Sequence, residues 1–237
     1  MDDVLCSWKV CLPQGRSLVW PDGCRDLIAI IPKNKAPELI CSGLDASPRI
    51  VTCPEETCFV GIRLAPGLTF PWEKDAPGSK CRDQSISPYL PDPHSCGFEA
   101  DPDAIGRVLL QMVSLANPAP RWIADYLTEL GTEGKKRATA FSPRSIRRQM
   151  VQFTGASPSY WKGLARARKA GYAIASSDIP LAHIAADHGF SDQAHLNREI
   201  RRWFGCTPNM LRVNGELSAA RLTAPDAFPH PQSRIYC

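Results

Sequence analysis

Short apolar runs broken by turn residues fill the first hundred positions of the chain. One run covers residues 27–31 and ends at Pro32, and another covers residues 59–64 and ends at Ala65-Pro66-Gly67. Runs of this length that are rich in Ile and Val and bounded by Pro and Gly favour β-strands over helices. The pattern predicts a small β-rich domain, a barrel or a sandwich, over about residues 1–98.

A helical period replaces this pattern at Asp101-Pro102. An Asp N-cap followed by Pro predicts a helix over residues 103–115. Its apolar residues are spaced for one face, namely Ile105, Leu109, Met112 and Val113. A second helix is expected over residues 121–130 and ends at Gly131, because glycine commonly stops helices. The two helices are expected to form a connector over residues 99–131.

Residues 142–212 divide into short helices with clear boundaries. Ser142-Pro143 opens a helix that ends at Gly155, and Ser157-Pro158 opens one that continues to Ala175. Thr207-Pro208 opens the last helix. Ser or Thr at the N-cap, with Pro at the first helical position, is typical of a helix start.

Two of the predicted helices have the proportions of a helix-turn-helix. Residues 180–188 and 192–204 are joined by Gly189-Phe190-Ser191, with Ser191 expected as the N-cap of the second helix. Leu196, Ile200 and Phe204 repeat at i, i+4 and i+8 and are expected to face a core. The outward positions carry side chains that bind base edges and phosphates, namely Gln193, His195, Asn197, Arg198 and Arg201. Since any amphipathic helix has a polar outer face, this helix alone leaves both interpretations open.

A second basic helix favours DNA binding. Opposite the apolar stripe of Ile146, Met150 and Phe153, the helix after Ser142 presents polar and basic residues, namely Arg144, Ser145, Arg147 and Arg148. Three guanidinium groups within five residues repel one another unless an anion receives them.

Charge is distributed unevenly along the chain. The 237 residues carry 28 Lys+Arg and 24 Asp+Glu, a formal charge of +4. Residues 133–212 alone carry 14 against 5, which is +9, and the remainder carries 14 against 19, which is −5. This asymmetry is typical of a nucleic-acid-binding module joined to a non-binding one, with a solvated helical surface as the alternative. A hydrophobic content of 43% excludes a disordered chain.

These residues closely resemble the DNA-binding domain of the AraC/XylS family of bacterial transcription regulators. The resemblance rests on the runs at 142–144, 155–158, 184–196 and 201–208, and it covers about residues 132–213. It implies two helix-turn-helix units joined by a linker helix at 157–175. One departure lies at residues 133–140, where Gly, Lys and Thr replace the aliphatic residues usual in the family and weaken the predicted helix. The candidate DNA-binding residues are Arg144, Ser145, Arg147, Arg148, Ser191, Gln193, His195, Asn197, Arg198 and Arg201.

The N-terminal half resembles a β-rich domain often found ahead of this module. The resemblance rests on residues 20–28 and 61–67. It implies a domain that senses a small molecule or mediates dimerisation. Five aromatic residues are candidates for an effector pocket, with a plain core as the alternative, namely Trp8, Trp20, Phe59, Phe70 and Trp72.

Eight of the ten cysteines lie in this half, namely Cys6, Cys11, Cys24, Cys41, Cys53, Cys58, Cys81 and Cys96. Metal or thiol sensing is one interpretation, with His94 and Cys96 as a candidate ligand pair. A zinc-bound Cys that accepts methyl groups from damaged DNA is another, but four thiolates with a Cys-x2-Cys pair are usual there. The nearest spacings here are Cys-x4-Cys. No secretory signal and no apolar run of about 18 residues is visible, so we expect a cytoplasmic protein with reduced, structural thiols.

Enzymatic motifs are missing from the sequence. No nucleophile elbow, Walker loop, Rossmann glycine pattern or HExxH motif occurs, so we expect no catalysis, no cofactor and no metal. Asp22 and Asp26 flank Arg25, which predicts an internal ion pair or a turn cap.

The sequence therefore predicts an α+β chain. We expect a β-rich barrel or sandwich as the regulatory domain over residues 1–98, a helical connector over 99–131, an all-α double helix-turn-helix domain over 132–213 and a mobile tail over 214–237. The expected function is a sequence-specific DNA-binding transcription regulator, controlled through its N-terminal domain by a small effector or by dimerisation. Double-stranded DNA is the expected partner, with RNA polymerase, an effector and a second copy as further candidates. A repair methyl acceptor or a thiol- or metal-sensing protein is the alternative.

Overall fold

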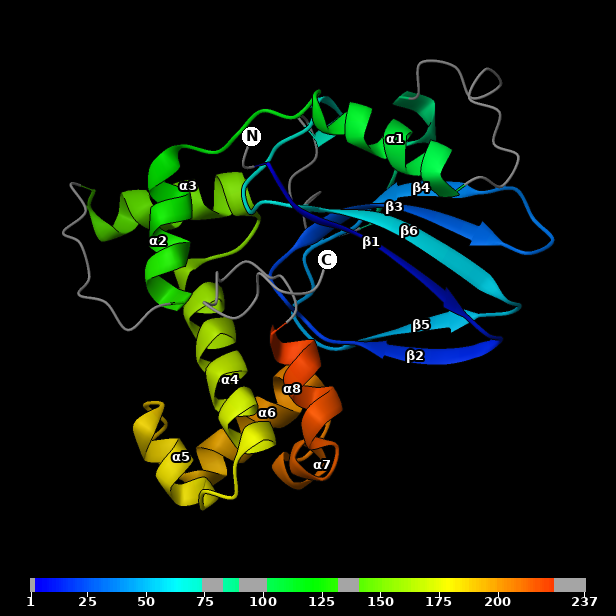
Figure 1. Cartoon of the computed structure of the whole chain (residues 1–237). Coiled ribbons are helices and arrows are strands. Elements are labelled where there is room, and N and C mark those ends of the chain that lie inside the picture. The colour runs from blue at the N-terminus through cyan, green and yellow to red at the C-terminus, as the bar shows by residue number, and fades with distance from the viewer. Residues whose placement is uncertain (1–2, 74–82, 90–101, 132–140, 224–237) are drawn as a thin grey trace.

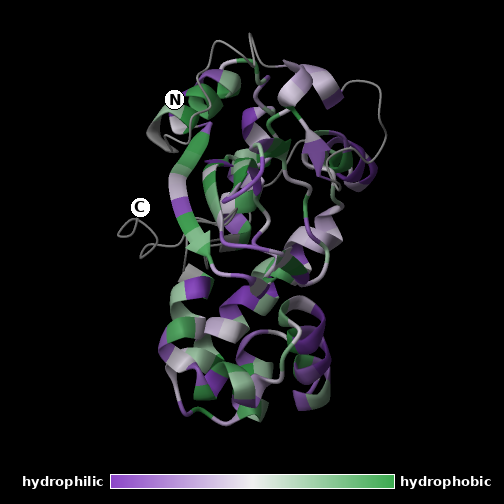
Figure 2. Ribbon diagram, turned by 90° about the vertical axis from the view of Figure 1, so that its right-hand side faces the viewer, coloured by the Kyte–Doolittle hydropathy of each residue, from purple (hydrophilic) through white to green (hydrophobic). Residues whose placement is uncertain are grey.

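A computed structural model of the chain describes residues 3–73, 83–89, 102–131 and 141–223. It consists of a β-rich N-terminal part and a helical C-terminal part, which are stacked on each other (Figures 1 and 2). The expected α+β class is confirmed. Among the described residues, no helix is long and apolar enough to cross a membrane.

Two antiparallel sheets build the N-terminal part. The larger has the strand order β1-β6-β3-β4-β7, and the smaller pairs β2 with β5 across from it (Figure 1). Within the described residues the sheets form an open sandwich and not a closed barrel. The strands predicted at 27–31 and 59–64 are confirmed within β3 and β6. The strand bounds are Val4–Leu12 (β1), Gly15–Val19 (β2), Arg25–Pro32 (β3), Glu38–Cys41 (β4), Arg49–Cys53 (β5), Thr57–Leu64 (β6) and Gln84–Ser85 (β7).

Each central strand of the larger sheet presents alternate residues to its two faces. On β3, Leu27 and Ala29 are buried on the face that α1 (Pro102–Val113) covers, and the four apolar residues of α1 singled out in its sequence lie in the same core. Ile28 and Ile30 line a cavity on the face toward β2 and β5. The N-terminal part is therefore layered as helix, large sheet, cavity and small sheet.

The boundaries of the C-terminal helices follow the predicted signals. Ser142, Ser157 and Thr207 are N-caps whose side chains accept a backbone N–H, and Pro follows each of them. Gly155 and Gly205 end two helices in the left-handed conformation, with φ of 80° and 68°. The bounds are Arg121–Gly131 (α2), Pro143–Thr154 (α3), Pro158–Ser176 (α4), Leu181–Asp187 (α5), Gln193–Phe204 (α6), Pro208–Val213 (α7) and Gly215–Thr223 (α8), with short 3-10 turns at Pro71–Glu73 and Ser87–Tyr89.

The connector and the tail differ from their expected forms. Of the two connector helices, α1 packs in the sheet core, whereas Ile123 and Leu127 of α2 pack in the core of the C-terminal helices. Residues 215–223 are not a mobile tail but the helix α8, whose Leu222 is buried against α4 near Gly171. Burial of this apolar side chain holds α8 in place. The remaining residues of the expected tail, 224–237, lie outside the described residues.

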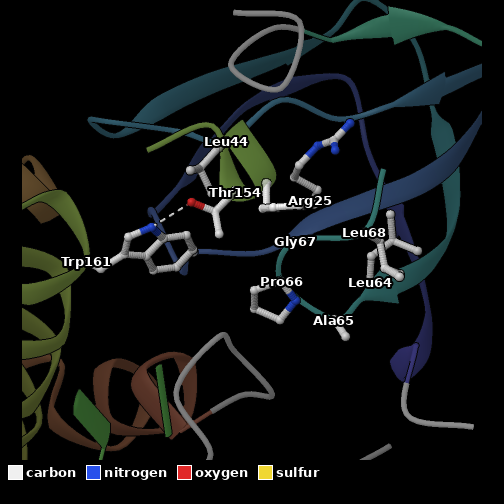
Figure 3. Close-up of a pocket in the computed structure, with 11 residues that line it drawn as sticks. Arg25, Leu44, Leu64, Ala65, Pro66, Gly67, Leu68, Thr154 and Trp161 are labelled. Atoms are coloured by element: carbon white, nitrogen blue, oxygen red, sulfur yellow. Dashed lines mark hydrogen bonds between the residues drawn. The ribbon is translucent and has the colours of Figure 1, made fainter. Parts of the chain in front are cut away.

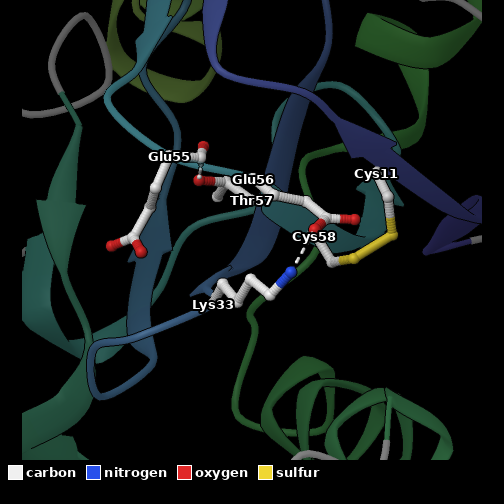
Figure 4. Close-up of a disulfide and its surroundings, with 6 residues drawn as sticks. All are labelled: Cys11, Lys33, Glu55, Glu56, Thr57 and Cys58. Atoms are coloured by element: carbon white, nitrogen blue, oxygen red, sulfur yellow. Dashed lines mark hydrogen bonds and ion pairs between the residues drawn. A yellow bond between two sulfur atoms is a disulfide. The ribbon is translucent and has the colours of Figure 1, made fainter.

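One cysteine pair is oxidised. Cys11 on β1 and Cys58 on β6 lie directly opposite each other and form a disulfide (Figure 4). The expectation of reduced thiols is therefore wrong for this pair, because antiparallel pairing places the two side chains on the same face of adjacent strands. Burial raises the pKa of the Cys41 thiol to about 11, so this cysteine is not a reactive thiolate. Cys81, His94 and Cys96 lie outside the described residues, and among those that the structure does describe, no His, Cys, Asp and Glu side chains group to hold a metal ion.

Gly61 allows a tryptophan to lie across the sheet. Its strand partner is Trp8, and a Cβ added to Gly61 would lie 2.2 Å from Cε2 of that indole. The indole Nε1 in turn donates a hydrogen bond to Oδ1 of Asp26 at 2.8 Å. Trp8 lines the cavity between the sheets, so a side chain at position 61 would displace part of the cavity wall.

We expect Gly61→Ala to lower the free energy of unfolding by about 1–3 kcal/mol, because the added methyl overpacks the site. Gly106→Ala in α1 is the matched control. Its added Cβ meets no heavy atom within 4 Å, and Ala is the better helix former by up to about 1 kcal/mol. Urea unfolding followed by circular dichroism measures both changes, and equal effects of the two substitutions would contradict the packing described here.

Candidate DNA-binding surface

Helix α6 has one buried face and one basic face. Leu196, Ile200, Trp203 and Phe204 are buried, which confirms the predicted apolar stripe. Gln193, Arg198 and Arg201 are exposed. Within the described part of the chain, no carboxylate lies within ion-pair distance of Arg198 or Arg201, although the charge of Asp192 attracts Arg198. The neighbouring Arg202 lies 3.6 Å from Glu199. The unpaired guanidinium groups are therefore available to an external anion.

The N-terminus of α6 is capped by Asp192 and not by Ser191 as expected. The carboxylate of Asp192 accepts the backbone N–H of His195 at 2.6 Å. This hydrogen bond lowers the pKa of the Asp192 carboxyl, which therefore stays charged beside the positive end of the helix dipole. Ser191 supports the cap through its hydroxyl, which lies 3.3 Å from Oδ2 of Asp192.

Two of the predicted contact residues are only partly exposed. The His195 ring lies 3.1 Å from Oγ of Ser191 and packs edge-on against Phe190, so it is half-buried. Asn197 is also half-buried, and its buried Oδ1 has no hydrogen-bond partner among the described residues. Both side chains are thus less exposed than Gln193 and Arg198, and their role as DNA contacts stays a prediction.

Helix α3 presents the first basic cluster. Arg144, Arg147 and Arg148 are exposed, and none of them pairs with a carboxylate among the described residues. Ser145 is half-buried and hydrogen-bonds the N-cap Ser142 through both its backbone N–H and its hydroxyl. Opposite them Met150 is buried, and Ile146 and Phe153 pack against the same core, as predicted. The segment 133–140, in which a weak scaffold helix is expected, lies outside the described residues.

Helix α4 separates the two basic helices. It has 19 residues and so spans about 28 Å, close to the roughly 34 Å of one DNA turn. Helices α2 and α3 lie at one end of α4, and α5 lies at the other (Figure 1). Trp161 at the start of α4 is buried, and its Nε1 donates to Oγ1 of Thr154 at the end of α3, at 2.9 Å (Figure 3). This contact fixes α3 against α4.

Both basic helices end at the N-terminal part. We call residues 42–49 the docking loop. Its residues 44–49 share a groove with residues 155–157 directly after α3, and the Tyr160 hydroxyl donates to the Asp45 carbonyl at 2.7 Å. A Cβ on Gly205, directly after α6, would lie 3.4 Å from Cγ of Pro48. The loop thus contacts the C-terminal ends of α3 and α6, whereas the first turns of these helices, with Arg144 on α3 and Gln193 on α6, lie at the opposite ends.

A second contact between the two parts lies at residues 65–68. Gly67 has φ of +91°, and its added Cβ would lie 2.6 Å from Cβ of Ala119. Between this turn and Trp161 only a cavity of about 10 Å³ remains (Figure 3). This joint is therefore closely packed and not a ligand site.

The candidate effector pocket lies elsewhere, between the two sheets. A cavity of about 360 Å³ is lined by three of the five predicted aromatic residues, Trp8, Trp20 and Phe59. Phe70 and Trp72 do not line it. They stack on each other with ring centroids 4.5 Å apart and pack in the core under α1. Their position after the end of β6 places them on the other face of the sheet.

Sequence reasoning missed the charged lining of this cavity. It comprises Asp22, Asp26, Asp45, Arg49, Arg63 and Asp83. Of the two alternatives predicted for Asp22 and Asp26, the turn cap is confirmed, because Oδ1 of Asp22 accepts the backbone N–H of Cys24 at 2.8 Å. The ion pair with Arg25 is wrong, since Arg25 pairs with the buried Glu73. Because successive residues of a strand point to opposite faces, Arg25 and Asp26 cannot share a partner on one face. The alternation of side chains along a strand could have indicated that Arg25 and Asp26 lie on opposite faces of the sheet.

The Asp192 cap can be tested through helix stability. We expect Asp192→Ala to lower the melting temperature, because the N–H of His195 loses its acceptor, while Asp192→Ser keeps an acceptor and restores most of the loss. The lowered pKa of Asp192 means that its stabilisation is present above the unfolded value of about 4 and is lost as the pH falls below it. The difference between the parent chain and Asp192→Ala is therefore expected to shrink in melts from pH 6 to pH 3. A constant difference would argue against a charged cap.

The C-terminal region of the chain is similar to known proteins. Residues 137–214 match the model of a helix-turn-helix domain. The chain is 33% identical over 98 residues to the HTH-type transcriptional activator RhaS of Escherichia fergusonii, which is 41% of this chain and 35% of that protein. With RhaS of Escherichia coli the identity is 29% over 92 residues, 38% of this chain and 33% of that one. The match thus spans about a third of the length of these curated relatives.

Among solved structures, ToxT from Vibrio cholerae O395 aligns over 89% of this chain and 97% of its own. The TM-score is 0.43 and the sequence identity is 9%.

Proposed function

We propose, from the premise that residues 137–214 form a helix-turn-helix domain of the AraC/XylS type, that the chain is a sequence-specific DNA-binding transcription regulator without enzymatic activity. The observation that carries the proposal is the pair of exposed, basic helix faces on α3 and α6, held apart by α4. In the relatives the same segment belongs to transcriptional activators, so RNA polymerase is a further proposed partner.

The proposed DNA contacts divide into two kinds. Gln193 and Arg198 are exposed at the N-terminal half of α6, where side chains can hydrogen-bond base edges in a major groove. Arg144, Arg147 and Arg148 on α3 supply positive charge for phosphates. The length of α4 suits two major-groove segments roughly 10 base pairs apart.

Control through the N-terminal part is the second element of the proposal. The docking loop lines the 360 Å³ cavity through Ser42, Gly43, Asp45 and Arg49, and contacts the ends of both basic helices. Trp20 also lines the cavity and packs on Phe204 at the end of α6, with ring centroids 5.2 Å apart. A small effector in the cavity would therefore act on the wall that holds α3 and α6. Dimerisation through the N-terminal part is an additional mode of control that this proposal includes.

Base recognition by α6 can be tested with selected DNA. The preferred site is first selected from random duplex DNA with the full chain. We expect Gln193→Ala with Arg198→Ala to relax the preference at defined positions, by about 1–3 kcal/mol for each bidentate hydrogen-bond pair that is removed. Lys162→Ala, an exposed residue of α4, is the matched control and is expected at most to weaken binding evenly across sequences. An unchanged selected site in the double variant would refute the assignment of α6.

Phosphate binding by α3 can be tested through salt. The logarithm of the association constant is expected to fall with the logarithm of the salt concentration, and the slope to shrink by about 0.9 for each phosphate that the protein no longer neutralises. Joint substitution of Arg144, Arg147 and Arg148 by Ala should reduce the slope by up to about 3. Arg16→Ala, exposed on β2, is expected to leave the slope unchanged. Fluorescence anisotropy over a range of KCl concentrations measures this, and equal slopes for all three proteins would exclude α3 from the interface.

A further inference from the structure

The cavity between the two sheets combines apolar walls with an acidic end. Its walls come from strands on both sides, with Val10, Ile28, Ile30, Ile40 and Val51 beside the three aromatic residues. A volume of about 360 Å³ falls in the range of small-molecule sites, which is roughly 300–1,000 Å³. An occupant would therefore be a largely apolar molecule with few polar atoms.

The inner charged group is centred on Arg63. Its Nη2 lies 2.8 Å from Oδ2 of Asp22, and its Nε lies 3.1 Å from Oδ1 of Asp26. Asp26 is 7% exposed and also accepts the indole N–H of Trp8. One guanidinium thus faces two carboxylates in a site with little water.

The second charged group lies closer to solvent and is centred on Arg49. Its Nη1 is 2.5 Å from Oδ2 of Asp83, and its Nε is 3.5 Å from Oδ2 of Asp45. Again one guanidinium faces two carboxylates. Together the lining holds four carboxylates and two guanidinium groups, and no Lys or His is among the described residues that line the cavity.

The excess of carboxylates is unfavourable in the absence of a cation. Burial raises the pKa of Asp26 although Arg63 opposes the shift, and burial together with the other three aspartates raises the pKa of Asp45 to about 6. A cation placed among these groups would be stabilised, whereas an added carboxylate would add repulsion and its own desolvation cost. Trp8 and Phe59 also line the cavity, and aromatic rings attract cations.

From this cavity we propose that the effector is an apolar organic cation, an amine or amidine on a hydrophobic body, whose charged end lies among Asp22, Asp26 and Asp45. This inference deepens the proposed function and depends on it for the role of the ligand as an effector. Binding of the cation to the cavity does not require DNA. An experiment can therefore refute the ligand class and the proposed DNA-binding function separately.

Three probes that differ only in the end group test the ligand class. They are 4-phenylbutylamine, 4-phenylbutan-1-ol and 5-phenylpentanoate, titrated into the full chain at pH 7.5 by calorimetry, with tryptophan fluorescence as a second readout. We expect the amine to bind at least about tenfold more tightly than the alcohol, since hydrogen bonds between charged partners add about 1.5–3 kcal/mol. The acid is expected to bind more weakly than the alcohol. Equal affinities, tightest binding of the acid, or no binding of any probe at 1 mM would overturn the proposal.

Asp45→Asn keeps the shape of the site and removes one charge. It is expected to weaken the amine about five- to tenfold and to leave the alcohol within twofold, which also shows that the variant is folded. Asp125→Asn, an exposed aspartate on α2, is the matched control with unchanged affinities. Equal weakening of amine and alcohol by Asp45→Asn would overturn the assignment of the charged end. Amine binding that leaves the affinity for the selected DNA site unchanged would support the ligand class and refute its role as an effector.

Discussion

A buried arginine on α4 connects three parts of this protein. Arg168 is 5% exposed, and its guanidinium donates to the carbonyls of Pro21, Arg221 and Leu222 at 3.3, 3.4 and 2.9 Å. A buried cation is costly unless its N–H groups are satisfied, so the turn that holds Pro21 and the end of α8 must stay beside α4. The stacking of the N-terminal part on the helices follows from this constraint, because the turn at Pro21 leads directly into the cavity wall.

The same region links the cavity to the basic helices. Trp20, next to Pro21, packs on Phe204, and the docking loop contacts the residues that follow α3 and α6. The contacts lie at the C-terminal ends of these helices, away from the first turns that carry Arg144 and Gln193. The N-terminal part can therefore hold α3 and α6 in a fixed relation without covering the exposed side chains proposed to bind DNA.

Capping residues next to each helix made the helices predictable from the sequence. The cavity could not be predicted, because it depends on contacts between distant segments. Ser142, Ser157 and Thr207 signal helix starts within four residues of sequence, and Gly155 and Gly205 signal helix ends in the same way. Such signals operate without tertiary contacts. Helix α8 has no comparable cap signal and depends on the burial of Leu222 against α4, so its sequence alone does not distinguish it from a tail. The aspartate–arginine groups and the disulfide depend on contacts between distant segments of the chain. Arg49 and Asp83 are 34 positions apart, and Arg63 and Asp26 are 37 apart. The disulfide joins cysteines 47 positions apart.

The basic faces of α3 and α6 and the acidic cavity between the sheets are separate sites. The distance between them determines how a ligand in the cavity could affect the basic helices. The first turns of α3 and α6, which carry the exposed Arg144 and Gln193, lie at the ends remote from the docking loop, and twelve residues of helix span about 18 Å. The Debye length at physiological ionic strength is about 8 Å, so the charge of a ligand in the cavity would be largely screened at these first turns. The charge of the ligand alone would therefore act too weakly on these turns to account for the proposed control of DNA binding. The remaining route is mechanical. A ligand that repositions Trp20 or Asp45 would change the contacts at Phe204 and Tyr160, and with them the position of α3 relative to α6.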